Sequence, residues 1–214
     1  MATIGMFDGV HLGHQFLIED LRKVASSEGL RSAVITFGDH PQRVLRPGGD
    51  LRMIMTLEER LRIIGELGVD TVIVMDFTPE LAALESREFM KLLMQDYGVR
   101  TLVMGFNHRF GCNKDEYFED YVTHGEELGL KVVRAREYQG EYSPVSSSLI
   151  RKMIEEGRVD LAKCYLSRPF ELSGVVVYGK QNGRKIGFPT ANLDVPSHII
   201  VPHRGVYTVK VTLE

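Results

Sequence analysis

The chain has 214 residues, enough for one large domain or one and a half of ordinary size, and its 43% hydrophobic and 26% charged residues are typical of a soluble globular protein. A net charge of −3 and a pI near 6.2 argue against nucleic acid or an anionic membrane surface as the main partner. No apolar run approaches the roughly 20 residues that span a bilayer, no signal peptide opens the chain, and Cys112 and Cys164 form no metal or redox motif, so we expect a cytoplasmic protein.

The first fourteen residues predict a β-strand that turns directly into a helix. Thr3 and Ile4 begin the strand, the run GMFDGV supplies turn residues, and His11 and His14 follow at the start of the helix. Their spacing places both imidazoles on one helix face, at the end where backbone N–H groups lack partners and the helix dipole is positive. Such a pair is most often ordinary helix surface, and no third ligand at metal spacing lies nearby. The glycine-rich turn before it favours a nucleotide-phosphate site.

Short apolar runs and helical patterns alternate from the start of the chain to about residue 167. The expected strands are rich in Val, Ile, Leu or Thr and are Ala33–Phe37, Thr71–Met75, Thr101–Met104 and Lys131–Ala135. The helices between them carry end signals: Gly29 stops the first, Thr56 and Glu59 form a capping box for the second, and Ser86 caps the third. Strands that are apolar on both faces, joined by crossover helices, predict an α/β domain with a Rossmann-like parallel sheet over residues 1–167.

Two further loops follow strands at the same expected edge of this sheet. The segment TFGDHP after the second strand holds His40, and GFNHRFG after the fourth holds Asn107 and Arg109. Turn chemistry alone explains glycine, aspartate and proline in loops. Because open α/β sheets bind ligands at their carboxyl edge, Asn107 is also a candidate to bond a ligand ring and Arg109 to pair with a phosphate. Phe106 or Phe110 is a candidate to stack on a flat heterocycle.

A second helix start, VSSSLIR at residues 145–151, places Ser146, Ser147 and Ser148 ahead of Arg151. A serine N-cap is common and needs no ligand. Three consecutive hydroxyls beside free backbone N–H groups are more than capping requires. An arginine this close to the helix N-terminus also opposes the helix dipole. A bound anion explains both features, so we predict a phosphate site here.

The pattern changes near residue 168. Phe170–Gly179 and Val206–Leu213 alternate apolar and polar residues, and turns rich in Gly, Pro and Asn separate them. This predicts antiparallel strands that begin a small β-barrel in a second domain over residues 168–214. Roughly 45 residues lie near the lower limit for a domain that folds alone. We therefore expect this barrel to be incomplete.

Four motifs, GMFDGVHLGH, TFGDHP, GFNHRFG and VSSSLIR, resemble in order and spacing the adenylyltransferase module of prokaryotic bifunctional riboflavin kinase/FAD synthetases. The run GFPTAN at residues 187–192 resembles the opening of the riboflavin kinase module of the same proteins. The resemblance covers essentially the whole chain, and GFPTAN is its most specific part. It implies an enzyme that forms FAD and pyrophosphate from FMN and ATP, and whose second module phosphorylates riboflavin to FMN.

The resemblance also implies roles for individual residues. The catalytic residues would be His11, His14 and Arg151. The ATP-binding residues would be Gly5, Phe7, Asp8, Gly13, Ser146, Ser147 and Ser148. The residues toward the flavin would be His40, Asn107 and Arg109. In the kinase module the ATP-binding residues would be Gly187, Thr190 and Asn192, of which Thr190 and Asn192 would hold Mg²⁺. Contact with phosphate would raise the pKa of both catalytic histidines and favour the doubly donating imidazolium.

Two features depart from the family pattern. Asp39 stands where the family commonly has proline, and the kinase module stops before the segment that holds the family's catalytic acid. Two alternatives remain open: another adenylyltransferase of the H-x-G-H superfamily, acting on a different small phosphate, and a flavin- or nucleotide-binding module without turnover. The intact set of histidines, serines and arginine argues against the second, because binding alone needs no such equipment. The sequence leaves the oligomeric state open.

Overall fold

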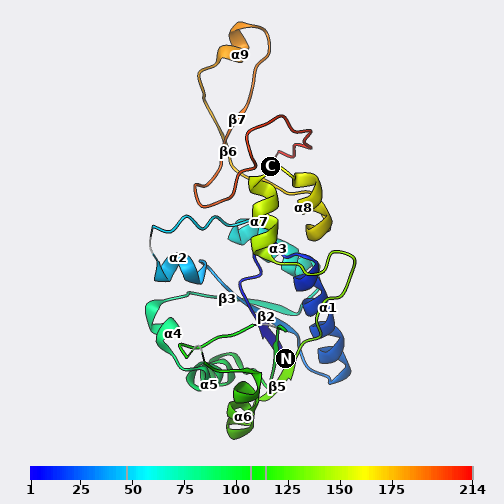
Figure 1. Ribbon diagram of the computed structural model, residues 1–214, viewed down its shortest axis with the longest axis vertical. Coiled ribbons are helices and arrows are strands. Elements are labelled where there is room, and N and C mark those ends of the chain that lie inside the picture. Colours follow the sequence, from blue (N-terminus) through cyan, green and yellow to red (C-terminus); the bar gives the residue numbers. More distant parts are fainter. Residues whose placement is uncertain (47, 107, 114, 214) are drawn as a thin grey trace.

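A computed structural model describes residues 1–46, 48–106, 108–113 and 115–213. Helices and strands alternate over most of that length (Figure 1). The strands are β1 (Ala2–Ile4), β2 (Ala33–Phe37), β3 (Thr71–Met75), β4 (Thr101–Met104), β5 (Lys131–Arg134), β6 (Val175–Val177) and β7 (Asn192–Asp194). The helices are α1 (Leu12–Ser27), α2 (Pro41–Leu45), α3 (Leu57–Glu66), α4 (Pro79–Ala83), α5 (Ser86–Tyr97), α6 (Phe118–Leu128), α7 (Ser147–Glu155), α8 (Val159–Leu166) and α9 (Asn182–Lys185).

The first five strands form one sheet in the order β3-β2-β1-β4-β5. Each neighbouring pair is parallel, with Ile4 of β1 opposite Ile35 of β2 and Val103 of β4 opposite Val133 of β5. Strands β2, β3 and β4 have the predicted ends, and β5 ends one residue earlier than predicted. Because the strands point the same way, their carboxyl ends meet at one edge of the sheet. The predicted Rossmann-like α/β architecture is confirmed.

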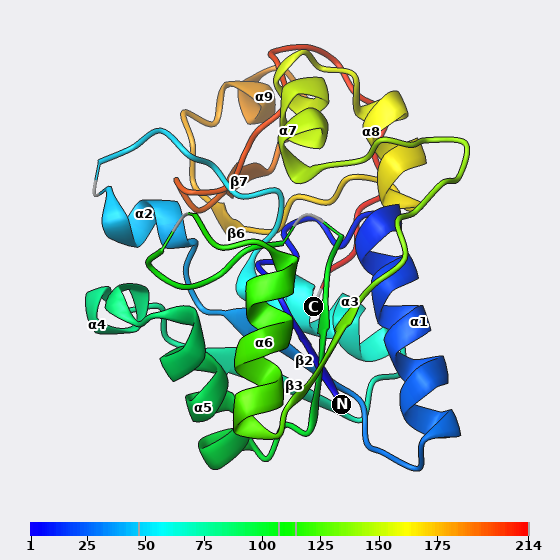
Figure 2. The same cartoon turned by 60° about the horizontal axis from the view of Figure 1, so that its bottom comes forward.

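Apolar side chains cover both faces of this sheet and its carboxyl edge. On one face α1 and α3 bury residues such as Ile18 and Ile64. On the other face α5 buries Met90 and Leu93, and Figure 2 shows α5 and α6 on the opposite side of the sheet from α1. Above the carboxyl edge, α7 and α8 form a third cluster around Ile150. Each such side chain stabilises the fold by roughly 1.5–3 kcal/mol through burial, so the helices that carry the motifs are firmly placed.

The helix starts follow the sequence signals with one exception. Thr56 and Glu59 form both halves of the predicted capping box, with N–H···O distances of 3.2 Å and 2.8 Å. The prediction that Ser86 caps α5 is wrong, because Glu85 is the N-cap and Ser86 is the buried first residue of the helix. The Glu88 carboxylate accepts the Glu85 N–H at 3.2 Å. This capping contact fixes the helix start one residue earlier than a serine cap would.

The C-terminal part of the chain forms less regular structure than the sequence predicts. β6 and β7 pair antiparallel, with Val176 opposite Leu193, and with α9 they form a hairpin that projects away from the parallel sheet (Figure 1). The predicted strand Val206–Leu213 is wrong: all of these residues are described, and none lies in a strand. An alternating pattern forms a strand when a neighbouring strand and an apolar layer are present. Val206 and Leu213 are instead exposed.

One C-terminal segment nevertheless packs on the first domain. The Met53 N–H donates to the His198 carbonyl at 2.7 Å, and the Ile200 N–H donates to the Met53 carbonyl at 2.9 Å. Together these bonds bridge Met53 to Ile199 in parallel. Both Ile199 and Ile200 are buried, and Ile200 belongs to the cluster formed by α7 and α8. The two predicted domains thus share part of a hydrophobic core.

Candidate active site

Directly after β1 the chain makes a tight turn. The Gly5 N–H donates to a β2 carbonyl at 3.0 Å, and the Val10 N–H then donates to the Phe7 carbonyl at 3.0 Å. Phe7 and Val10 have φ of 51° and 39°, and Gly9 has φ of 83°. The left-handed region suits glycine, but at a β-branched residue it costs roughly 1–3 kcal/mol and persists only where the surroundings enforce it. Strain of this kind concentrates at functional sites.

Asp8 ties this turn to two other parts of the chain. Its buried carboxylate accepts the Ile54 N–H at 3.0 and 3.1 Å and pairs with Arg151 Nη2 at 2.8 Å. Its carbonyl accepts the Ser147 hydroxyl at 2.8 Å. Burial raises the pKa of Asp8 above its ordinary value, while Arg151 and the Ile54 N–H oppose that rise. The carboxylate expected at ATP is therefore engaged with the protein itself in this structure.

The starts of α1 and α7 lie side by side. A Cβ on Gly13 would approach Val145 Cγ1 within 3.0 Å and His11 Cε1 within 3.3 Å, so the absence of a side chain there permits the close approach. Ser146 is the N-cap of α7, and its hydroxyl accepts a backbone N–H of the helix at 3.2 Å. Ser148 is exposed. The two segments expected to share a phosphate are thus brought together.

The two predicted catalytic histidines stack on each other. The ring centroids of His11 and His14 are 3.6 Å apart, and their planes differ by 15°. His11 is the N-cap of α1, and its Nδ1 accepts the His14 N–H at 3.3 Å. Burial lowers the pKa of His11 to about 4 and lowers that of His14 well below its ordinary value. Both rings are therefore neutral at pH 7 in this structure.

A buried arginine outside the set of predicted site residues lies at the same edge. Arg60 of α3 donates to the Met6 carbonyl at 2.9 Å and to the Phe37 carbonyl at 2.5 Å, just where β1 and β2 end. Burial lowers its pKa to about 10. A signal was present in the sequence: Arg60 shares the apolar face of its helix with Ile63 and Ile64. A charged residue at such a position needs buried polar partners.

The loops after β2 and β4 add further histidines. His40 is the N-cap of α2, and burial, together with the charge of Arg151, lowers its pKa to about 4. His108 of GFNHRFG is not among the predicted site residues, and burial lowers its pKa to about 4 as well. Its charge, when present, lowers the pKa of His14. Asn107 lies outside the residues that the structure describes.

The aromatic residues of the β4 loop divide into two groups. Phe110 packs against Tyr121 in the core, with centroids 4.7 Å apart. Phe106 is exposed and is the remaining candidate to stack on a heterocycle. The Arg109 guanidinium lies 4.9 Å from the centroid of the Tyr117 ring, so in this structure it stacks on an aromatic residue of its own domain.

Three buried nitrogen atoms at the carboxyl edge have no hydrogen-bond partner within the described residues. They are His14 Nδ1, Arg60 Nε and Arg151 Nε. An unpaired buried polar atom costs roughly 1–3 kcal/mol. Native proteins keep few of them, and those they keep call for an explanation such as a ligand or bound water. Three of the seven such side-chain atoms among the described residues lie at this edge, which makes it the candidate site.

The GFPTAN motif lies apart from this edge, within the projecting hairpin, between α9 and the start of β7 (Figure 1). Gly187, Thr190 and Asn192 are all exposed. Hydroxyl and carboxamide oxygens are hard donors of the kind that Mg²⁺ accepts, so Thr190 and Asn192 fit that metal. In the described part of the chain no group of three or more His, Cys, Asp or Glu side chains is placed to hold a metal ion.

Comparison with known proteins shows the family to which the chain belongs. A family model described as FAD synthetase matches residues 1–149, and one described as riboflavin kinase matches residues 166–214. The bifunctional riboflavin kinase/FMN adenylyltransferase of Listeria monocytogenes is 33% identical over 98% of this chain and 67% of its own length. Those of Bacillus subtilis and Escherichia coli K12 are 35% and 33% identical over 98% and 99% of this chain and 66% and 67% of their own lengths. The chain thus spans about two thirds of the length of these curated relatives.

A solved structure shares the fold. It is a crystal structure described as a macrolide-efflux protein from Streptococcus pneumoniae, with a TM-score of 0.85 and 32% identity over 96% of this chain and 67% of that one. Its described role differs from that of the curated relatives. No described helix of the present chain is both long enough and apolar enough to cross a membrane.

Proposed function

The chain belongs to the family of bifunctional riboflavin kinase/FMN adenylyltransferases, and we propose that its first domain, residues 1–167, transfers AMP from ATP to FMN to give FAD and pyrophosphate. The part from residue 168 onward belongs to the domain that phosphorylates riboflavin to FMN. ATP, FMN and riboflavin are then the substrates. A cytoplasmic location is supported by Cys112 and Cys164, which are both free thiols.

The meeting of two helix starts at one edge of the sheet carries this proposal. Helices α1 and α7 both begin there, and Gly13 of the first lies against Val145 just before the second. Each start offers backbone N–H groups and the positive end of a helix dipole to an anion. The unpaired buried nitrogens of His14 and Arg151 lie in the opening turns of the same two helices. A bound triphosphate would satisfy both sets of donors.

Adenylyl transfer asks the protein for positioning and charge stabilisation. An oxygen of the FMN phosphate attacks the α-phosphorus of ATP, the bond from that phosphorus to the bridging oxygen breaks, and its electron pair leaves with pyrophosphate. The attacking phosphate is already an anion, so no base has to remove a proton. Negative charge grows on the α-phosphoryl oxygens and on the leaving group, and fixed donors at those positions lower the barrier.

We assign His11 and His14 to the α- and β-phosphate oxygens. Because Nδ1 of His11 accepts a backbone N–H, the neutral ring carries its proton on Nε2, and this is the atom left to donate. Phosphate contact raises the pKa of the pair. The rings are stacked 3.6 Å apart, so a charge on one opposes a charge on the other. We expect the bound pair to carry at most one additional proton at pH 7.

Arg151 is assigned to the leaving β- and γ-phosphates. Its ion pair with the Asp8 carboxylate at 2.8 Å fixes the guanidinium before ATP arrives, so little ordering remains for the bound state. This ion pair also accounts for an arginine near a helix N-terminus, where a cation is otherwise unfavourable. The remaining residues that we assign to ATP are Gly5, Phe7, Gly13, Ser146, Ser147 and Ser148.

We propose that the FMN side of the site lies at the loops after β2 and β4. We assign His40, Asn107 and Arg109 to FMN or to the phosphate being transferred. The lowering of the His40 pKa by the charge of Arg151 supports its nearness to the phosphate end. The exposed ring of Phe106 offers a surface for the flavin ring system.

In the second domain, Gly187, Thr190 and Asn192 are assigned to ATP. Thr190 and Asn192 would also hold Mg²⁺, which when bound neutralises phosphate charge. The Thr190 hydroxyl and the Asn192 carboxamide lie just before and at the start of β7, two residues apart, so one short segment orients both. Among the described residues of the first domain, no group of three or more His, Cys, Asp or Glu side chains is placed to hold a metal ion. We propose that Mg²⁺ reaches this site together with ATP.

The test is to mix the chain with ATP, Mg²⁺ and FMN and to measure released pyrophosphate and formed FAD. We expect the two products in equal amounts. Pyrophosphate with pantetheine phosphate or nicotinamide mononucleotide, but not with FMN, would assign the chain to another adenylyltransferase of the superfamily. The absence of pyrophosphate with all three substrates would leave a binding module without turnover.

A further inference from the structure

Residues 7–10 form a turn that we call the histidine turn because His11 follows it directly. This turn is held through its carbonyl oxygens. The Phe7 carbonyl accepts the Val10 N–H, and the Asp8 carbonyl accepts a serine hydroxyl of α7. The carbonyls of Gly9 and Val10 are reached from a different direction, by a side chain that follows α8 in the segment joining the two domains. The strained turn is therefore supported partly from outside its own domain.

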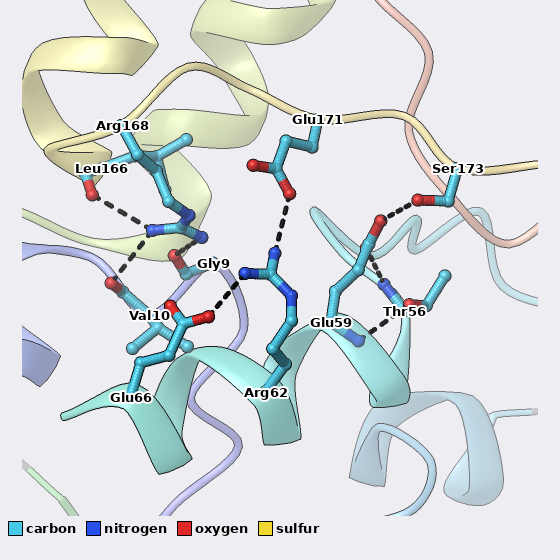
Figure 3. A network of polar contacts seen from close by, with 10 residues as sticks. All are labelled: Gly9, Val10, Thr56, Glu59, Arg62, Glu66, Leu166, Arg168, Glu171 and Ser173. Atoms are coloured by element: carbon cyan, nitrogen blue, oxygen red, sulfur yellow. Dashed lines mark hydrogen bonds and ion pairs between the residues drawn. The ribbon is translucent and has the colours of Figure 1, made fainter. Parts of the chain in front are cut away.

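Arg168 makes these contacts (Figure 3). Its Nη2 donates to the Gly9 carbonyl at 2.8 Å, and its Nη1 donates to the Val10 carbonyl at 3.5 Å and to the Leu166 carbonyl at 3.1 Å. The Gln15 carboxamide donates to the same Val10 and Leu166 carbonyls at 2.8 and 3.0 Å. One guanidinium and one carboxamide thus bridge the histidine turn to the end of α8.

The surroundings of Arg168 show that its hydrogen bonds are directed to the turn. The side chain is half-buried, and burial lowers its pKa. The carboxylates of Glu171, Glu59 and Glu66 face it. Arg62 pairs with Glu66 at 2.8 Å and with Glu171 at 3.0 Å, as Figure 3 shows. Glu66 and Glu171 are thus bound by the guanidinium of Arg62, and Glu59 accepts the Thr56 N–H and the Ser173 hydroxyl. Arg168 donates instead to backbone carbonyls.

We propose that Arg168 is a positioning residue for adenylyl transfer, an inference that rests on the function proposed above. It acts through the histidine turn, since Val10 is followed directly by His11. Without its guanidinium the positive φ of Val10 loses a support, and the turn relaxes together with the imidazoles of His11 and His14. Transfer depends on the placement of these donors within fractions of an ångström, so the displacement lowers turnover more than substrate binding.

Three variants test this role. Arg168→Met removes the donors and keeps much of the volume, whereas Arg168→Lys keeps the charge with a single donor group. Arg62→Met is the matched control, because it removes a guanidinium from the same network without touching the histidine turn. We expect kcat for FAD synthesis to fall roughly 10- to 100-fold in Arg168→Met, to recover in part in Arg168→Lys, and to stay within about twofold in Arg62→Met. KM for ATP and FMN should stay within about twofold throughout.

The imidazole NMR signals of His11 and His14 supply a readout that does not depend on turnover. We record these signals under conditions in which each variant is folded. They should shift in Arg168→Met and stay in place in Arg62→Met. If Arg168→Met does not fold, the signals of Arg168→Lys test the proposal. Unchanged kcat, unchanged signals, or an equal loss in Arg62→Met overturns the proposal. If the wild-type chain forms no FAD, the proposed function fails, and the imidazole signals then decide alone whether Arg168 holds the turn.

Discussion

The carboxyl edge of the parallel sheet and the projecting C-terminal hairpin carry equally clear motifs, but the side chains of the two motifs differ in burial and in bonding partners. At the edge, Asp8 and Arg151 are largely buried and bound to each other. In the hairpin, Thr190 and Asn192 are exposed, and Phe188 leaves 75% of its surface uncovered. A motif thus becomes an organised site only where other parts of the chain supply partners for its polar atoms.

The largest effect should come from breaking the ion pair at the edge. Arg151→Met leaves the Asp8 carboxylate buried without its partner, so we expect a loss of about 3–5 kcal/mol in the free energy of unfolding, measured with urea. The double variant Asp8→Asn/Arg151→Met should regain much of that stability but not the rate of FAD synthesis. Recovery of both would mean that Arg151 acts through folding alone.

Removing a phosphate donor should cost turnover and little stability. His14→Asn is expected to lower kcat for FAD synthesis by about 10²–10³, the usual loss for one transition-state donor. Steady-state assays and thermal unfolding of the same preparations check this. A variant that keeps its rate while its unfolding temperature drops would show that the histidine is structural.

The buried histidines predict how stability depends on pH. The pKa of His11 is lowered to about 4, so between pH 4 and 6.5 the unfolded chain binds more protons than the folded one. The contribution of His11 to the free energy of unfolding is therefore fully present above pH 6.5. It falls by on the order of 3 kcal/mol as the pH drops toward 4. The raised pKa of Asp8 acts in the opposite direction. Urea unfolding across this range gives the slope, and His108→Asn should flatten it, because the pKa of His108 is lowered to about 4 as well.

The smallest expected effect is a difference in the free energy of unfolding between variants in two parts of the C-terminal region. Ile200→Val removes one methylene from a side chain that is 1% exposed and should lower the free energy of unfolding by about 0.5–1.5 kcal/mol. Val176→Ala, in the hairpin at 57% exposure, should change it by less than about 0.5 kcal/mol. Equal losses in the two variants would contradict the contrast between the packed and the projecting segments.

Much of the fold could be predicted because its signals are local. The strands of the parallel sheet read as apolar runs, and the Thr56–Glu59 capping box needs only three residues of spacing. Val206–Leu213 has an equally clear alternation, but a strand also requires a neighbour, which lies elsewhere in a chain. Ser86 shows the limit for helix starts, where two good capping residues stand side by side and the contact made by Glu88 decides.

The candidate site also has residues that could be predicted from the sequence and residues that could not. The histidine pair and the serine-rich helix start could be found because their residue types and spacing point to phosphate chemistry. His108 and Arg168 could not, because what matters is the effect of the His108 charge on His14 and the hydrogen bonds of Arg168 to distant carbonyls. Arg60 gave a partial signal by its place on the apolar face of α3, but its carbonyl partners lie far away in the sequence. The Asp8–Arg151 pair joins residues far apart in sequence. Only the folded chain reveals that the anion beside Arg151 is a carboxylate of the protein.

The bridge from Met53 to Ile199 bears on how the protein is made. Ile54, whose N–H holds the Asp8 carboxylate, packs in the same cluster as Ile200. A nascent polypeptide leaving the ribosome presents Ile54 long before Ile200 has been translated. The hydrophobic cluster of the first domain therefore lacks Ile200 until synthesis has passed well into the second domain. The two domains then complete their folding together and not one after the other.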